Sequence, residues 1–118
     1  MPTQIDTPDF FIKALKRLIR KYPELLAEFD VLKAQLENDE RPGDQIPHVG
    51  YEVYKVRLKN PSAQRGKSGG FRVIYYVRVV DKIIMLMVYS KMDRENVPAQ
   101  EIRDVIEEIL GNSDSDEG

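Results

Sequence analysis

Residues 54–90 decide the fold, and they read YKVRLKNPSAQRGKSGGFRVIYYVRVVDKIIMLMVYS. Polar and apolar side chains alternate in the first six positions, which is the period of a half-buried β-strand. A glycine-bearing turn over residues 60–70 leads into FRVIYYVRVV, a run rich in β-branched and aromatic residues. Asp81 and Lys82 predict a tight turn, and the almost wholly apolar KIIMLMVYS that follows predicts a central strand. The stretch therefore predicts three consecutive antiparallel strands.

Helical periodicity flanks these strands on both sides. Thr-Pro-Asp at residues 7–9 predicts a helix start, and apolar residues at spacings of three and four continue to about Glu37, interrupted where Pro23 breaks the helix. Residues 38–50 predict a loop, and a final helix ends at Gly111. We therefore expect an α+β fold, in which two N-terminal helices (a hairpin or a kinked pair) pack on a small twisted antiparallel sheet of three to four strands, with a C-terminal helix.

Length and composition limit the classes of function. A chain of 118 residues predicts one domain, at residues 8–111, between an N-terminal segment (1–7) and a disordered acidic tail (112–118). With no cysteine and a single histidine, the chain is not expected to hold a disulfide framework, a metal or another cofactor. The longest apolar run is far shorter than the ~20 residues that cross a bilayer, and the first ten residues are unlike a secretory signal. We expect a cytoplasmic protein.

Net charge is distributed unevenly along the chain. The protein has 18 basic and 20 acidic residues, which gives a net charge of −2. Residues 53–80 contain seven of the basic residues and no acidic one, so the rest of the chain holds 11 basic and 20 acidic residues. A local charge of +7 in an otherwise acidic chain is typical of a surface that binds a polyanion. The alternative is a set of solvated strand ends and a charged loop.

The alternation in the first strand places several cations together. Lys55, Arg57 and Lys59 project from one face at intervals of about 7 Å, close to the spacing of phosphates along a nucleic-acid strand. Arg72 can join them if the next strand pairs antiparallel with the first. Tyr76 shares the side of Arg72, where it can either stack on a base or fill the core.

Such a face can catalyse as well as bind. RNA is cleaved when its own 2′-hydroxyl attacks the adjacent phosphorus, which requires a base, cations for the phosphorane charge and an acid for the leaving oxygen. Lys55, set among other cations, is the candidate for the base, and Arg72 suits charge stabilisation. His48 is the usual acid–base residue type, but it lies in a loop without an evident partner, so we expect it to be structural or exposed.

The same segments resemble the RelE/ParE toxin superfamily. The similarity rests on YKVRLK (54–59), the glycine-bearing turn, GFRVIYYV (70–77), an apolar strand ending in YSK (89–91) and a closing helix. The longer two-helix start and the RGKSGGFRVIYY stretch (65–76) make the chain most similar to the RelE and HigB toxins, over roughly residues 10–110. The resemblance implies the toxin of a type II toxin–antitoxin system: a ribosome-dependent endoribonuclease that cleaves translated mRNA and is inhibited by a cognate antitoxin.

The resemblance also implies roles for individual residues. Lys55 matches the family's general base, Arg72 matches the arginine that stabilises the phosphorane, and Arg57 stands where a second lysine is common. We take these three residues as catalytic. Further residues are expected to contact RNA or the ribosome: Lys59, Arg65, Lys67, Tyr76, Arg78, Lys91 and Arg94.

One departure from the family pattern bears on activity. The family's additional arginine and its catalytic tyrosine align with Met92 and Pro98, so the general acid is missing or displaced, and Tyr89 is the candidate substitute. Two alternatives stay open: a toxin of the same fold that inhibits DNA gyrase, which the intact basic set disfavours, and a catalytically inactive RNA-binding or interaction module. Any toxin implies an antitoxin, whose acidic or amphipathic helical segment is expected to cover the basic face or displace the last helix.

Overall fold

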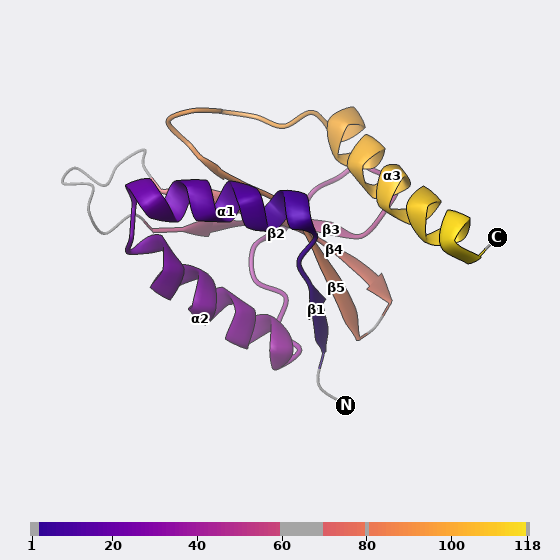
Figure 1. Cartoon of the computed structure of the whole chain (residues 1–118), viewed down its shortest axis with the longest axis horizontal. Coiled ribbons are helices and arrows are strands. Elements are labelled where there is room, and N and C mark those ends of the chain that lie inside the picture. The colour runs from indigo at the N-terminus through magenta and orange to yellow at the C-terminus, as the bar shows by residue number, and fades with distance from the viewer. Residues whose placement is uncertain (1–2, 60–69, 80, 118) are drawn as a thin grey trace.

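The protein forms a five-stranded sheet with helices on both faces (Figure 1). The computed structural model describes residues 3–59, 70–79 and 81–117, with side chains as far as residue 111. Strands follow the order β1-β5-β4-β3-β2, with β1 parallel to β5 and all other pairs antiparallel. Along the chain, the elements are β1 (Gln4–Asp6), α1 (Asp9–Lys21), α2 (Leu25–Glu37), β2 (Asp44–Gln45), β3 (Val53–Leu58), β4 (Phe71–Val79), β5 (Lys82–Ser90) and α3 (Ala99–Glu117).

The predicted α+β fold is confirmed, and the sheet is wider than predicted. β1 and β2 lie in stretches that were predicted as an N-terminal segment and as a loop. They are three and two residues long, too short for an alternating pattern to reveal them. Each is an edge strand, held by pairing with β5 or β3, so tertiary contacts rather than local sequence create it.

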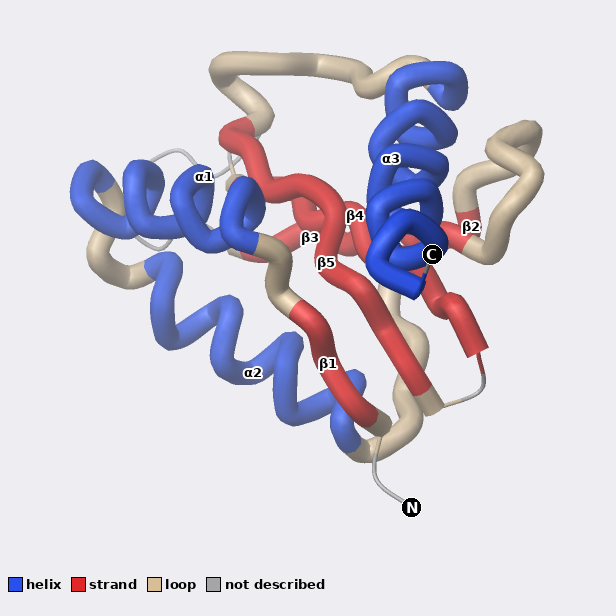
Figure 2. The backbone as a smooth tube through the Cα atoms, turned by 45° about the vertical axis from the view of Figure 1, so that its right-hand side comes forward, coloured by secondary structure: helices blue, strands red, loops and turns tan. Residues whose placement is uncertain are grey.

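α1 and α2 cover one face of the sheet (Figure 2). Pro23 lies between them, as predicted, because its ring cannot continue a helix. The helix start differs by one residue from the prediction: Pro8 rather than Thr7 is the N-cap, and its carbonyl accepts hydrogen bonds from the backbone N–H groups of Phe11 and Ile12. The buried side chains that these helices contribute are Phe11, Leu15, Leu25, Phe29, Leu32 and Leu36.

α3 packs on the opposite face and covers only part of it. Its fully buried Ile102 and Ile106 join a second core with β-strand residues that include Val53 and Tyr76. The predicted helix end at Gly111 is wrong, because α3 continues through residues that were assigned to the tail. Gly111 does not adopt the positive φ of a glycine that terminates a helix. None of the described helices is long and apolar enough to cross a membrane.

Candidate functional site

The register of β3 and β4 brings three predicted catalytic cations together. Arg57 lies directly opposite Arg72, and Lys55 lies two residues along β3 on the same face. This face is the one that α3 partly covers, since Ile74, which pairs with Lys55, is buried in the core beneath that helix. Arg57 is exposed, whereas Lys55 and Arg72 are half-buried. We call these three residues the cationic end of the sheet.

Gly70 maintains this register. Its φ is +95°, and a Cβ at this position would lie 2.7 Å from the Leu58 carbonyl oxygen, so a larger residue would force β3 and β4 apart. The Gly70 carbonyl also accepts a 3.0 Å hydrogen bond from the backbone N–H of Lys91, which joins the end of β5 to the start of β4. Gly70 therefore has a structural use: it lets β3 and β4 approach closely, with Arg57 opposite Arg72.

β5 adds a phenol to the same cross-strand row, because Tyr89 lies opposite Arg72. The register of β4 and β5 shifts in mid-strand, which leaves Leu86 as an extra residue in a β-bulge. The extra residue reverses the alternation, so Val88 packs in the core under α1 and α2 whereas Tyr89 packs on the α3 side. If the side chains of β5 alternated without interruption, Tyr89 would face the α1–α2 core, as Ile83 and Met85 do.

The Tyr89 hydroxyl occupies an unusual environment. It is buried and has no hydrogen-bond partner among the residues that the structure describes. Burial raises the pKa of the phenol, while the positive charges of Arg72 and Arg94 oppose that rise. The phenol therefore stays protonated at neutral pH.

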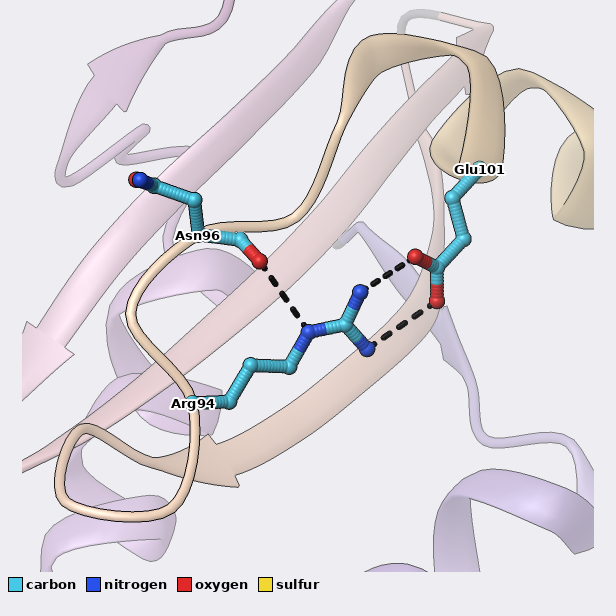
Figure 3. A network of polar contacts seen from close by, with 3 residues as sticks. All are labelled: Arg94, Asn96 and Glu101. Carbon is cyan, nitrogen blue, oxygen red and sulfur yellow. Dashed lines mark hydrogen bonds and ion pairs between the residues drawn. The ribbon is translucent and has the colours of Figure 1, made fainter.

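The segment between β5 and α3 holds Arg94 in a defined position (Figure 3). Its guanidinium group donates hydrogen bonds to both carboxylate oxygens of Glu101, one of them at 3.0 Å, and its Nε donates to the Asn96 carbonyl at 3.1 Å. The hydrogen bond to Glu101 raises the pKa of Arg94. Arg94 therefore connects the loop to the first turn of α3. No sequence signal predicted Glu101 as its partner.

Two of the remaining predicted contacts to RNA, Lys59 and Lys91, lie at the same end of the sheet as Arg72, because each follows a residue that pairs with Phe71. Lys59 is exposed directly after β3, and Lys91 follows β5, where its ammonium group donates to the Glu95 carbonyl at 3.3 Å. Arg65 and Lys67 lie outside the described residues.

Two predicted RNA contacts do not join the cationic end. Tyr76 is 6% exposed and packs edge-on against Tyr51, with ring centroids 5.5 Å apart, so its ring fills the core instead of stacking on a base. Arg78 is exposed near the other end of β4, about 20 Å along the strand from Arg72. A period of two predicts the face of a side chain but not which part of that face a helix covers.

Three further residues that were considered for acid–base or RNA chemistry are exposed, namely His48, Met92 and Pro98. His48 is exposed, as expected, and its carbonyl accepts a 2.7 Å hydrogen bond from Arg103 of α3. Met92 is 77% exposed, and Pro98 immediately precedes α3. Within the described ranges, no three His, Asp or Glu side chains are grouped as metal ligands.

Comparison with known proteins identifies the family of this chain. Residues 12–111 match the family described as "RelE toxin of RelE / RelB toxin-antitoxin system". The E. coli toxin RelE, solved as a mutant in the free state, has a similar structure, with a TM-score of 0.53 and 20% identity over 80% of this chain and 90% of that chain. This likeness shows the fold alone, and no curated protein matches. Because the family match spans most of the chain, the protein belongs to the RelE toxin family, the toxins of RelE/RelB toxin–antitoxin systems.

Proposed function

We propose that this RelE toxin is a ribosome-dependent endoribonuclease that cleaves translated mRNA at its cationic end. The observation that carries the proposal is the β3–β4 register, which sets Arg57 and Arg72 side by side. Lys55 lies two residues along β3, on the same face. Among the described residues, none of these three cations forms an ion pair with a carboxylate. Three adjacent positive charges without a neutralising partner favour a polyanionic ligand, and the phosphodiester backbone of RNA supplies one.

The three cations fit the roles that cleavage requires. Lys55, as the free amine, accepts the proton of the 2′-hydroxyl, whose oxygen then attacks the adjacent phosphorus. Arg57 and Arg72 bind the non-bridging oxygens, where negative charge accumulates in the phosphorane. The bond between phosphorus and the 5′-oxygen breaks, which yields a 2′,3′-cyclic phosphate and a 5′-hydroxyl. The RNA itself supplies the nucleophile.

A RelB-type antitoxin is the partner that family membership implies. We propose that its acidic or amphipathic helical segment either covers the cationic end or displaces α3. Coulomb attraction between exposed charges is screened by salt, so the first arrangement predicts a complex that weakens as salt is raised. A complex whose affinity is unchanged in high salt favours displacement of α3, because the contact would then be mainly apolar.

Induced expression in a bacterial host tests the function. The wild type, the double variant Lys55→Ala/Arg72→Ala and the control Arg20→Ala, which removes an exposed cation from α1, are compared by growth and by primer extension on a reporter message. We expect growth arrest with new 5′ ends inside translated codons for the wild type and the control, and neither effect for the double variant. Arrest with intact messages would contradict the proposal and indicate gyrase or another protein target. No arrest and no cleavage would indicate an inactive binding module.

A further inference from the structure

We propose that Tyr89 is the general acid of this site, the group that protonates the 5′-oxygen as its bond to phosphorus breaks. The inference rests on the proposed RNA cleavage and supplies a proton donor that the cationic end lacks. Arginine is too weak an acid for that task, and Lys55 acts as the base in the same step.

The strand order places base, cation and acid as an in-line reaction needs them. The attacking and leaving oxygens lie on opposite sides of the phosphorus, so base and acid must flank the group that binds the non-bridging oxygens. Lys55, Arg72 and Tyr89 lie on three neighbouring strands in this order, with Arg72 in the middle. From the strand spacing and the rise per residue, the backbones of Lys55 and Tyr89 are about 12 Å apart, a span that two side chains and one phosphodiester fill.

The placement of Tyr89 depends on the β-bulge at Leu86. Bulges are frequent beside active sites, where they redirect a side chain. Here the bulge turns Tyr89 out of the α1–α2 core and onto the row of Arg57 and Arg72. A buried hydroxyl without a partner is unfavourable, and phenylalanine would serve equally well for packing alone. Packing alone therefore does not explain the hydroxyl group of Tyr89.

The charges around the phenol suit proton donation. Burial keeps the hydroxyl protonated before reaction, while Arg72 and Arg94 stabilise the tyrosinate that remains after the proton has left. The hydrogen bonds of Arg94 to Glu101 and Asn96 hold its guanidinium group in place (Figure 3). The other five tyrosines lie elsewhere. Tyr54 and Tyr75 face the α1–α2 core, and Tyr51 and Tyr76 belong to the core under α3. Tyr22 ends α1.

The proposed step balances in atoms and protons. The bond between the 2′-oxygen and phosphorus forms while the bond between phosphorus and the 5′-oxygen breaks. The 2′-hydroxyl proton passes to Lys55, and the Tyr89 proton passes to the 5′-oxygen. Water then returns a proton to the tyrosinate and removes one from the lysine.

Single-turnover cleavage of mRNA on programmed ribosomes tests this role. The wild type, Tyr89→Phe and the matched control Tyr54→Phe, which loses its hydroxyl on the opposite face of the sheet, are each given two messages. One message carries the natural linkage at the cleaved position, and the other carries sulfur in place of the bridging 5′-oxygen. Removing a general acid slows a reaction by about 10²–10⁴-fold, so we expect that loss for Tyr89→Phe on the natural message and no loss for the control.

The sulfur message separates proton donation from a structural role. A thiolate leaves without being protonated, so Tyr89→Phe should cleave this message at close to the wild-type rate. Wild-type rates for Tyr89→Phe on the natural message would overturn the assignment. Equal losses on both messages would also overturn it, because the hydroxyl would then act on folding or positioning. A wild-type protein that leaves both messages intact would contradict the proposed function itself.

Discussion

The two faces of the sheet differ in how completely helices cover them. On the α1–α2 face, β4 is buried as far as Val77, through Phe71, Val73, Tyr75 and Val77. On the α3 face of the same strand, Ile74 and Tyr76 are buried, whereas Arg72 remains half-exposed. One alternating strand can therefore contribute to a closed core on one side and to a charged site on the other, because a single helix covers only part of the second face.

This difference separates stability from activity. The α1–α2 face, which we call the closed face, excludes water from apolar side chains, and this burial is the main source of folding free energy. The cationic end buries little apolar surface and keeps like charges together, which adds nothing favourable to folding. Large-to-small substitutions on the closed face should therefore destabilise the protein, and substitutions at the cationic end should leave a folded protein with altered RNA chemistry.

The largest expected effect is on the closed face. Phe71 is fully buried, and its ring packs edge-on against Tyr22 with centroids 5.2 Å apart. Phe71→Ala should lower the free energy of unfolding by about 3–5 kcal/mol, a large part of the stability of a small domain. The adjacent change Arg72→Ala should lower it by less than about 1 kcal/mol. Urea unfolding followed by circular dichroism measures both, and equal losses would contradict the contrast between the faces.

A smaller loss of stability is expected at Gly70, where β3 and β4 approach closely. Gly70→Ala introduces a side chain at positive φ and against the Leu58 carbonyl, which should cost about 1–3 kcal/mol. The amide of Lys91, which is hydrogen-bonded to Gly70, should then exchange faster with deuterium. Gly111→Ala is the matched control: it lies in α3 with nothing within 4 Å of the added Cβ, and it should stabilise the protein by up to about 1 kcal/mol. Normal protection of Lys91 in Gly70→Ala would argue against this role of the glycine.

Alkaline pH should affect the closed face through Tyr75. Burial, and then the neighbouring Tyr54, raise the pKa of Tyr75, whose hydroxyl donates a 2.6 Å hydrogen bond to the Pro42 carbonyl. Because the folded pKa is raised, the unfolded chain releases this proton first. The contribution to stability is complete below about pH 10 and falls by up to about 1.4 kcal/mol per pH unit above it.

Tyr75→Phe isolates that contribution. It should lower stability at neutral pH, because the hydrogen bond to Pro42 is lost, yet stability should decline less steeply above the usual tyrosine pKa than in the wild type. Thermal denaturation at a series of alkaline pH values measures the two slopes. Identical slopes would show that Tyr75 ionises as readily in the folded protein as in the unfolded chain.

The smallest expected effect concerns one charge at the cationic end. If Arg57 contacts a phosphate, Arg57→Gln should reduce the slope of log affinity against log salt by about 0.7–0.9. Binding to message-programmed ribosomes at several salt concentrations measures this slope. Lys33→Gln, on the exposed side of α2, is the control and should leave it unchanged. Equal slopes for wild type and Arg57→Gln would remove Arg57 from the contact surface.

Local periodicity was sufficient to predict that three cations share one face of the sheet. A period of two places Lys55, Arg57 and Arg72 on one face, and their strands pair antiparallel as predicted. The bulge at Leu86 could not be predicted, because β5 is apolar on both faces and its sequence carries no alternation that an extra residue would interrupt. For that reason the sequence offered Tyr89 only as a substitute acid and did not place it opposite Arg72.

Other features depend on contacts between distant parts of the chain. The burial of Tyr76 follows from where α3 lies, and the pairing of Arg94 with Glu101 follows from how the preceding loop reaches that helix. β1 and β2 exist because neighbouring strands offer them partners. Such features are set by tertiary structure, which no local pattern encodes.

The central claim is that RNA is cleaved at the end of the sheet where Arg72 lies. Single-turnover cleavage of mRNA on programmed ribosomes by Arg72→Ala and Arg78→Ala tests it most directly, since the two variants remove the same side chain from opposite ends of β4. Loss of a group that stabilises transition-state charge should slow Arg72→Ala by about 10²–10³-fold, with Arg78→Ala close to the wild type. An Arg72→Ala variant that cleaves at the wild-type rate, or an Arg78→Ala variant that is equally slow, would contradict the account.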